Sequence, residues 1–355
     1  MNTGNVIRAD IRALAAYDVP SADGMVKLDA MENPFPLPPG IREALGRTVE
    51  NLALNRYPAP SAPALKRCLR EMMELPSSAA MILGNGSDEL IQMLALAVAT
   101  PDAVIMGVEP SFVMFHMIAR LARVRFVGVP LKSDFSLDGA ALLGAIAEHR
   151  PALIFLAYPN NPTGNCFDES IMEAVLKAST GLVVVDEAYY PFTPRSFKRH
   201  LGQYPNLLLM RTLSKLGLAG VRLGWLCGPE AVVNEIEKVR LPYNISVLDQ
   251  AAAVVVLEQR AVLQEQVQEI VHQREYVRLQ LAALSGVEVF PSEANFLLFR
   301  VPEAARIFDG LRQHGILIKN LTQAHSLLHD CLRVTVGASE ENQAFLSAIK
   351  LLVGR

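Results

Sequence analysis

The sequence has few of the features that mark exported, membrane-spanning or nucleic-acid-binding proteins. It has four cysteines, which are scattered and form no CxxC pair, a usage that favours small buried thiols in a reducing cytosol. The longest apolar runs, such as 251–257, are far shorter than the roughly 20 residues of a membrane span. Residues 1–20 carry charges and no uninterrupted apolar stretch, so a secretory signal is not expected. We therefore expect a cytoplasmic chain with no membrane span.

An excess of charge of one sign is also missing. The formal net charge is −3, and like charges form no block, so nothing favours nucleic acid or an anionic membrane as a partner. Hydrophobic residues make up 51% of the 355 residues and charged residues 19%, which excludes disorder and allows a large core. The length suggests one larger and one smaller domain.

Apolar runs and helical patterns alternate through the first two thirds of the chain. Strands are expected at 103–107, 125–129, 153–157, 182–185 and 207–210, with one more at 222–227. Helices are expected at 41–50, 87–99, 111–122, 138–148 and 168–178. Nearly continuous apolar strands that alternate with helices predict an α/β fold with a mostly parallel sheet sandwiched by helices.

The last third predicts a smaller α+β domain. A long helix is expected over 250–284, followed by strands at 287–290, 296–299, 315–318 and 332–336 and by helices at 302–314 and 339–353. The first forty residues are proline-rich near their end and predict an extended arm. We expect the arm, 1–40, to pack with the small domain, 246–355, while 41–245 forms the large domain.

Asp186 and Lys215 are the most informative residues. Each follows an apolar run that predicts a buried strand, and ligands of open α/β sheets bind beyond the carboxyl ends of strands. A lysine can hold an aldehyde cofactor as a Schiff base, and a carboxylate can keep the ring nitrogen of that cofactor protonated, as with pyridoxal phosphate. A buried aspartate is costly unless it is paired, and a pyridinium would supply the partner.

Two segments carry groups that suit a phosphate. The segment 84–89 is glycine-rich and starts a helix, whose first amides attract phosphate, although a plain capped turn is the simpler interpretation of this segment alone. Thr212, Ser214 and Arg222 flank Lys215, and hydroxyls with a guanidinium hold a phosphate dianion. The ordinary alternative for Arg222 is a surface arginine on a strand.

Further candidates suit the rest of such a cofactor. Asn161, in the turn 161–164, could donate to a ring hydroxyl, and Tyr189 could donate to the same oxygen; a plain turn and an aromatic at the rim of the core are the alternatives. Phe112 could stack on a pyridine ring or belong to the core. Glu187 is interpreted as a solvated or structural neighbour of Asp186.

The order of these motifs resembles the fold-type-I pyridoxal-phosphate aminotransferases over nearly the whole chain. A glycine-rich helix start, NPTG, Asp-x-x-Tyr and Ser-Lys-loop-Arg follow one another on successive strand ends. The resemblance implies that Lys215 bears the cofactor, that Asp186 pairs with its pyridine nitrogen and that Phe112 stacks on its ring. It implies that Asn161 and Tyr189 bind the ring hydroxyl. The residues that it places at or beside the phosphate are Gly86, Ser87, Asp88, Thr212, Ser214 and Arg222.

Within that family the chain is most similar to the histidinol-phosphate aminotransferases. The similar segments are 28–34, 55–58, 212–224 and 331–337. The resemblance implies amino transfer between histidinol phosphate and 2-oxoglutarate in histidine biosynthesis, with Arg333 gripping the substrate's phosphate, or a carboxylate in other relatives. It implies a homodimer in which Tyr57 reaches the neighbouring subunit's site, and it places Tyr17 and Tyr243 at further substrate or cross-subunit positions. Asn161 would also contact substrate.

Three features depart from that pattern or compete with it. The stretch from Lys215 to Arg222 is one residue shorter than in many relatives, so its path must differ. Lys319 stands where many relatives carry arginine, and a lysine is a point charge that cannot bind phosphate as a fork. His325 and His329 have the i, i+4 spacing of zinc ligands, but the glutamate of an HExxH motif is missing. We expect a polar surface segment there and no metal.

Three other functions stay open. An aromatic or other amino-acid aminotransferase would use Arg333 for a carboxylate. A pyridoxal-phosphate lyase, such as a threonine-phosphate decarboxylase, closely resembles the same subfamily. A non-catalytic effector-binding module of this fold is disfavoured because Lys215 is retained and no basic DNA-binding segment is attached.

Overall fold

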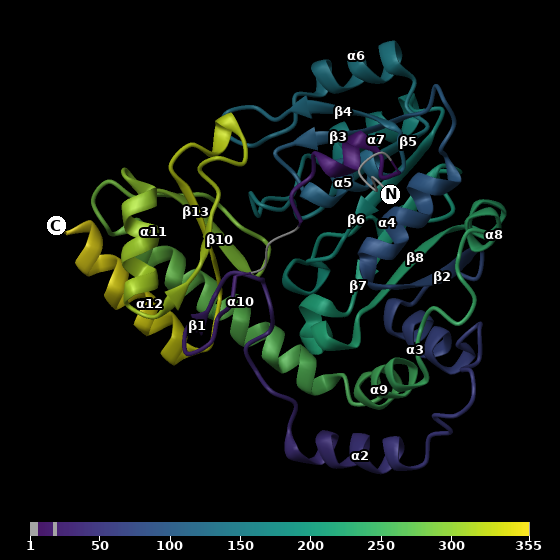
Figure 1. Cartoon of the computed structure of the whole chain (residues 1–355), viewed down its shortest axis with the longest axis horizontal. Coiled ribbons are helices and arrows are strands. Elements are labelled where there is room, and N and C mark those ends of the chain that lie inside the picture. Colours follow the sequence, from purple (N-terminus) through teal and green to yellow (C-terminus); the bar gives the residue numbers. More distant parts are fainter. Residues whose placement is uncertain (1–5, 17–19, 355) are drawn as a thin grey trace.

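The computed structural model describes residues 6–16 and 20–354. A seven-stranded sheet forms the centre of the larger part of the molecule, at the right in Figure 1. Its strands, in spatial order, are β2 (Ala79–Asn85), β8 (Leu223–Pro229), β7 (Leu207–Thr212), β6 (Leu182–Asp186), β5 (Leu153–Ala157), β3 (Val104–Glu109) and β4 (Arg125–Pro130). β8 is antiparallel to β2 and β7, and the other pairs are parallel. The α/β fold with a mostly parallel sheet is therefore confirmed.

Helices cover both faces of this sheet because its strands are apolar on both faces. In β7, Leu207 and Leu209 belong to one core cluster, while Leu208 and Met210 belong to the cluster on the opposite face. The helices of the larger part are α2 (Pro39–Glu50), α3 (Pro63–Met73), α4 (Gly86–Ala97), α5 (Val113–Leu121), α6 (Gly139–His149), α7 (Glu169–Ala178), α8 (Glu230–Glu237) and α9 (Val247–Leu257). Alternation along each strand thus fixes three layers.

The smaller part, at the left in Figure 1, is built on a four-stranded antiparallel sheet. Its strands, in spatial order, are β12 (Lys319–Asn320), β13 (Cys331–Thr335), β10 (Phe296–Arg300) and β9 (Glu288–Val289). One face packs on α10 (Ala261–Ala282), α11 (Ala304–Gln313) and α12 (Ser339–Val353). The N-terminal segment has a short helix, α1 (Ala9–Arg12), and a strand, β1 (Val26–Lys27), which pairs with β11 (Ile316–Leu317).

The sequence prediction of one long helix over 250–284 is wrong. The chain forms two helices, α9 and α10, which are separated at 258–260. α9 packs against α2 and α3, whereas α10 packs against α12 of the smaller part, so tertiary contacts turn a chain that contains no local helix breaker. The prediction also lacked β2, α3 and α8. The strand β2 contains alanines and a glycine, which have low strand propensity, and neighbouring strands stabilise it.

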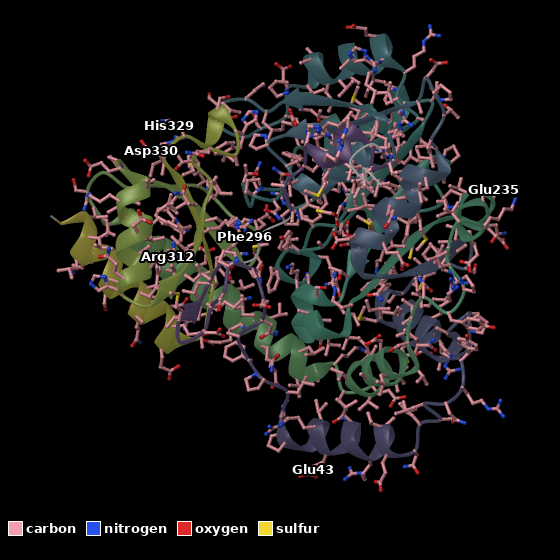
Figure 2. All side chains as sticks on the ribbon, in the orientation of Figure 1. Glu43, Glu235, Phe296, Arg312, His329 and Asp330 are labelled. Atoms are coloured by element: carbon pink, nitrogen blue, oxygen red, sulfur yellow. The ribbon has the colours of Figure 1, made fainter. Side chains whose placement is uncertain are left out.

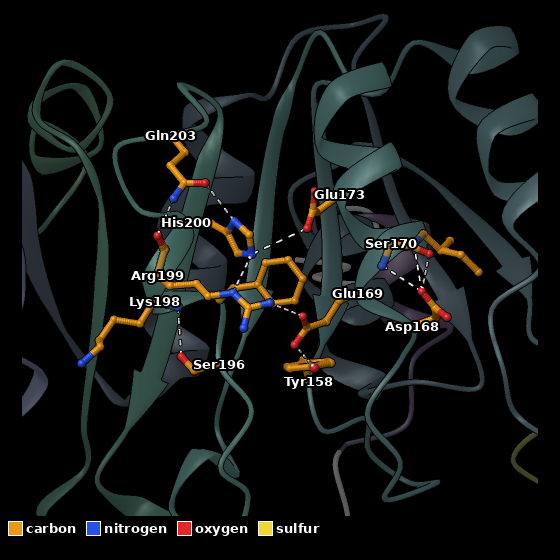
Figure 3. Close-up of polar contacts among 12 residues, drawn as sticks. Tyr158, Asp168, Glu169, Ser170, Glu173, Ser196, Lys198, Arg199, His200 and Gln203 are labelled. Atoms are coloured by element: carbon orange, nitrogen blue, oxygen red, sulfur yellow. Dashed lines mark hydrogen bonds and ion pairs between the residues drawn. The ribbon is translucent and has the colours of Figure 1, made fainter.

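A polar cluster braces the segment that follows β6 against α7 (Figure 3). Tyr158, directly after β5, donates to Glu169 of α7 over 3.1 Å, and Arg199 forms an ion pair with the same carboxylate. His200 lies 3.9 Å from Glu173. These contacts hold the loops beyond β5 and β6 in place, and the candidate residues Asn161 and Tyr189 lie on those loops.

The described part of the chain contains no helix that combines enough length with enough hydrophobicity to cross a membrane.

Candidate active site

The candidate residues gather beyond the carboxyl ends of β5, β6 and β7. Asp186 is the last residue of β6 and Thr212 the last of β7. Lys215 lies in the wide π-helical turn that follows β7. One cavity at this edge of the sheet is lined by Met31, Ser87, Asp88, Phe112, Ala157, Pro159, Asn161, Asp186, Ala188, Tyr189, Thr212, Ser214, Lys215 and Arg222. The fold thus brings together side chains that are up to 191 positions apart in the sequence, as the strand-end argument expects.

One end of the cavity is suited to an anion. α4 begins at Gly86, and the first amides of a helix have no partner within the helix and lie at the positive end of its dipole. The hydroxyl oxygens of Thr212 and Ser214 lie 2.9 Å apart. The guanidinium of Arg222 reaches Ser214 Oγ at 3.5 Å and Asp88 Oδ2 at 3.4 Å. Amides, hydroxyls and a guanidinium form a donor set for a phosphate dianion.

We call this end of the cavity, formed by residues 86–88, 212, 214 and 222, the anion cup. Gly86 leaves room in it for the guanidinium of Arg222. Its φ of +79° lies in the left-handed region, and a Cβ there would lie 2.6 Å from Nη2 of Arg222. Arg222 is itself left-handed, with φ of 52°. The segment from Lys215 to Arg222 forms a wide turn in which Gly217 has a φ of 131°. The segment ends at Arg222, whose side chain contacts Asp88 of α4.

Asp186 is a buried carboxyl, with 4% of its surface exposed. One oxygen accepts a hydrogen bond from the Ala188 N–H over 3.0 Å. Burial raises the pKa of Asp186 to about 7, and the negative charges of Asp88 and Glu187 act in the same direction. A protonated ring nitrogen beside it would favour the ionised carboxylate.

Lys215 has the opposite shift. Its Nζ donates to the carbonyl of Ala30 over 3.1 Å and lies 6.0 Å from the centre of the Tyr189 ring. Burial of the ammonium group lowers the pKa of Lys215 to about 8, and repulsion from Arg333 and Arg222 contributes. A sizeable fraction of this amine is therefore neutral near physiological pH, which is the form that attacks a carbonyl.

Three candidates form a continuous hydrogen-bonded line. The Asn161 side chain donates from Nδ2 to the Tyr189 hydroxyl over 3.1 Å and accepts at Oδ1 from Nη1 of Arg333 over 2.6 Å. All three residues are buried. Arg333 also donates from Nη2 to the Asp29 carbonyl over 3.0 Å and stacks over Phe296, with 5.3 Å from Cζ to the ring centre.

Phe112 lies at the start of α5 and lines the cavity. The loop that carries it is fixed by Asn160, which is fully buried and was not predicted. Asn160 Nδ2 donates to the Pro110 carbonyl and to Thr163 Oγ1, and its Oδ1 accepts from Ser111 Oγ. Asn160 thereby ties the loop after β3 to the turn after β5. The sequence gives no signal for Asn160, because asparagine is an ordinary turn residue and Asn160 directly precedes the turn at Asn161.

Glu187 is a structural residue and is not solvated. It is 0% exposed and accepts two bonds from Arg211, from Nε over 2.9 Å and from Nη2 over 2.7 Å. The Phe197 N–H and the Ser196 hydroxyl also donate to it. Of the two expectations for Glu187, the solvated one is wrong, because Arg211 on β7 supplies a buried partner that the local sequence does not reveal.

Tyr57 and Tyr243, which were expected at substrate or cross-subunit positions, lie on the surface of this chain and outside the cavity around Lys215. Tyr57 is 80% exposed and stacks on Tyr243 with 4.4 Å between the ring centres. Leu54 and Leu248 line the same surface hollow and are exposed by 61% and 41%. Neither tyrosine lines the cavity around Lys215. Tyr17 lies outside the described residues.

A second cavity of about 260 Å³ adjoins the first and opens between the two parts of the molecule. Met31, Phe112, Asn161 and Arg333 line it, and the first three also line the cavity around Lys215. Among its other lining residues are Lys319 and His325 from the smaller part and Glu109 and His116 from the larger part. Sequence reasoning gave no role to Glu109, His116 or Met31. Met31 lies in the segment 28–34 that carried the resemblance, and its contacts with the site were the missing information.

The histidine pair does not form two ligands on one helix face. A single 3₁₀ turn, Ser326–Leu328, separates the residues. His329 has 79% of its side chain exposed and lies 3.3 Å from Asp330, whereas His325 lines the second cavity. Figure 2 shows His329 and Asp330 at the outer edge of the smaller part, apart from Phe296 beside the site. Across residues 6–16 and 20–354, three or more His, Cys, Asp or Glu side chains nowhere cluster as metal ligands.

Comparisons with known proteins agree on one family. The family model of aminotransferase class I and II matches residues 23–349. Histidinol-phosphate aminotransferase 2 of Cupriavidus pinatubonensis is 53% identical over 97% of this chain and 95% of its own length. Histidinol-phosphate aminotransferase 1 of Ralstonia nicotianae is 51% identical over 97% and 94%.

Solved structures share the fold. The histidinol-phosphate aminotransferase of Sinorhizobium meliloti, solved in complex with pyridoxal-5'-phosphate, superposes with a TM-score of 0.88 and 25% identity, over 98% of this chain and 97% of that one. An L-threonine-O-3-phosphate decarboxylase of Porphyromonas gingivalis superposes with a TM-score of 0.77 and 22% identity, over 93% and 100%. This second likeness extends to the fold alone.

Proposed function

The chain belongs to the class I and II aminotransferase family, and we propose that it moves an amino group between histidinol phosphate and 2-oxoglutarate in histidine biosynthesis. The reverse pair would be imidazole-acetol phosphate and glutamate. Relatives about half identical over nearly their full length carry that name. The observation that carries the proposal is that Lys215 and Asp186 share a cavity with an anion cup, next to a second cavity lined by Arg333 and Lys319.

We propose pyridoxal 5'-phosphate as the cofactor, because three features of the cavity fit its three polar ends. Gly86, Ser87, Asp88, Thr212, Ser214 and Arg222 form the anion cup, and each would bind the phosphate or lie beside it. The buried carboxyl of Asp186 would pair with the ring nitrogen, and Asn161 with Tyr189 would hold the ring hydroxyl. When bound, this group supplies an electron-poor ring that accepts electrons from the substrate carbon. Phe112 would stack on that ring.

Lys215 would act first as the point of attachment and then as the proton carrier. Its Nζ, buried in the cavity, would hold the cofactor through the cofactor's aldehyde carbon. The neutral Nζ would accept a proton from the substrate carbon, a task that works best for a base whose pKa lies near the working pH. Its pKa of about 8 meets that condition. The buried carboxylate of Asp186 would place its negative charge beside the ring nitrogen, which preorganises the electrostatics of the site.

Arg333 and Asn161 would bind the acidic end of the substrate, with Lys319 beside them. Arg333 and Lys319 are direct partners across the β12–β13 pair, so their side chains project from the same face of the sheet. Two cations on one face suit a phosphate, whose charge exceeds that of a carboxylate. This favours histidinol phosphate over an ordinary amino acid as the amino donor.

We also propose a homodimer located in the cytoplasm. The exposed stack of Tyr57 and Tyr243, with Leu54 and Leu248, is an apolar surface that a second copy could cover. Tyr57 would then enter the neighbouring site, and Tyr17 remains a proposed substrate contact. Four free cysteines suit a reducing compartment.

Amino transfer from histidinol phosphate to 2-oxoglutarate tests the proposal directly. Purified enzyme with pyridoxal phosphate should form glutamate, with a kcat/KM for histidinol phosphate at least about 100-fold above that for phenylalanine, because the substrate's phosphate is gripped by charge-assisted hydrogen bonds. A preference for phenylalanine would establish an aromatic aminotransferase. Release of carbon dioxide from threonine phosphate without 2-oxoglutarate would establish a decarboxylase.

A further inference from the structure

The smaller part presents three nitrogen-bearing side chains on one wall of the second cavity. They are Lys319 of β12, Arg333 of β13 and His325 of the connection between these strands. Lys319 and Arg333 are cross-strand partners, with Cβ atoms roughly 5 Å apart in such pairs. On the opposite face of β13, Leu332 and Val334 pack against the helices of the smaller part. Sheet alternation therefore directs both cations to the cavity.

His325 occupies a braced position in this connection. The Leu321 N–H donates to the Cys331 carbonyl over 3.0 Å where the connection leaves the sheet. Leu328 is 1% exposed, and its N–H donates to the carbonyl of His325 over 2.9 Å. The backbone that carries the imidazole is thus anchored at both ends.

The hydrogen bonds of His325 select its tautomer. Nδ1 accepts from the Leu327 N–H over 3.2 Å, so the neutral ring must carry its proton on Nε2. The imidazole is therefore a hydrogen-bond donor at Nε2 while Nδ1 caps the 3₁₀ turn.

We infer that His325 donates from Nε2 to the phosphate of the amino donor, as a third ligand beside Lys319 and Arg333. This assignment rests on the proposed function. The ammonium group of Lys319 is a point charge and cannot bind a phosphate through two parallel hydrogen bonds as a guanidinium can. Arg333 already donates hydrogen bonds to Asn161 and to the Asp29 carbonyl. The three oxygens of a phosphate can accept several hydrogen bonds, so a third donor residue on the same wall adds a contact that Lys319 and Arg333 leave available.

The charges across the cavity agree with this orientation. Glu109, at the end of β3, and His116, on α5, face the cavity from the larger part, with Glu109 Oε1 3.8 Å from His116 Nδ1. A carboxylate on that wall repels an anion, while three donors on the wall of the smaller part attract it. The phosphate should therefore lie against the smaller part.

The test compares His325→Ala with His329→Ala, which removes an imidazole four residues away that is largely exposed and does not line the cavity. His325→Ala should raise the KM for histidinol phosphate about 10-fold or more, the loss expected for one hydrogen bond to a charged group, with kcat changed less than about 3-fold. His329→Ala should match wild type. Inorganic phosphate, as a competitive inhibitor, should bind His325→Ala correspondingly more weakly.

A binding measurement without turnover supports the kinetics. Calorimetric titration of the cofactor-loaded enzyme with imidazole-acetol phosphate, without an amino donor, should show the same loss of affinity in His325→Ala. His325→Asn can still accept from the Leu327 N–H but lacks Nε2, so it should behave like the alanine variant while keeping the turn capped. Equal KM and affinity in the His325 and His329 variants would overturn the assignment. If wild type itself does not use histidinol phosphate, the proposed function fails instead.

Discussion

Asp186 and Lys215 are the two ionisable side chains to which we assign the proposed chemistry, and burial destabilises the charged form of both. Burial raises the pKa of Asp186 and lowers the pKa of Lys215. Each shift means that the protein without cofactor is less stable than it would be with neutral side chains at these positions. Functional sites commonly lower the stability of a protein in this way, because the arrangement that serves activity is not the most stable one.

Lys215→Ala should abolish amino transfer, with a loss on the order of 10⁴-fold or more in kcat, because no other residue can replace the attachment and the proton carrier together. The measurement is glutamate formation in the presence of excess pyridoxal phosphate. Lys177→Ala is the matched control, since Lys177 is an exposed lysine on α7 paired with Glu173, and it should keep wild-type activity. An active Lys215→Ala enzyme would contradict the proposed role.

Asp186→Asn should lower activity while stabilising the protein without cofactor at pH 8. The folded pKa of about 7 lies above the ordinary value of 3.8, so the folded state binds more protons than the unfolded state between these values. Stability therefore falls as pH rises through that window, and asparagine removes the fall. Urea unfolding of the two apoproteins at pH 5 and pH 8 measures it. The advantage of the variant should grow with pH, and a constant difference would contradict the argument.

At the scale of elements, the order of strands and helices placed most of the site. Apolar runs in the sequence mark the strand ends, so the positions of Asp186, Thr212 and Lys215 at or after those ends can be predicted from the sequence. Asn160 and the pair of Glu187 with Arg211 could not, because their partners are non-local: 24 positions separate Glu187 from Arg211, and Asn160 reaches 50 positions back to the Pro110 carbonyl. Hydrogen bonds of this kind depend on tertiary packing, to which local patterns are insensitive.

The pair of Glu187 and Arg211 joins the loop after β6 to β7, so breaking it should destabilise the larger part. Glu187→Gln leaves Arg211, which is 7% exposed, without its buried counter-charge, and a loss of about 3 to 5 kcal/mol is expected. Urea unfolding of the protein measures the change. Glu235 lies on α8, is labelled in Figure 2 and forms an exposed ion pair with Lys238. Glu235→Gln should therefore lower the free energy of unfolding by less than about 1 kcal/mol. Similar losses in both variants would refute the structural role of Glu187.

The start of α4 can be tested through its first residue. Gly86→Ala places a methyl group against Arg222 and keeps a left-handed φ that alanine disfavours. We expect pyridoxal phosphate to bind about 10-fold or more weakly, because the guanidinium must leave the cup. Cofactor absorbance during titration of the apoprotein measures this. Gly46→Ala in α2, where a Cβ meets no atom within 4 Å, should leave cofactor affinity unchanged, and an equal affinity in Gly86→Ala would count against the cup.

At the scale of the whole molecule, the site depends on segments that the sequence placed in separate parts. β1 of the N-terminal segment pairs with β11 of the smaller part, and Ala30 and Met31 then reach Lys215 and the cavity around it. The division into an arm (1–40), a large domain (41–245) and a small domain (246–355) remains our proposal. The second cavity opens between the larger and the smaller part, so its shape depends on how these two parts pack, a property to which local sequence patterns are insensitive.

The proposed dimer with shared sites predicts complementation between a weakened variant and an inactive one. Tyr57→Ala should weaken the neighbouring site, and Lys215→Ala should inactivate its own. In a mixed dimer, the subunit that keeps Lys215 receives Tyr57 from its partner, so that one site is complete. Refolding the two variants together in equal amounts makes half of the dimers mixed, and about a quarter of wild-type activity should return at limiting substrate. If Tyr57 served its own subunit, every site with Lys215 would lack it, and the mixture would stay as weak as Tyr57→Ala diluted by half. The kcat/KM of the refolded mixture, compared with the same variants mixed without refolding, separates the two arrangements.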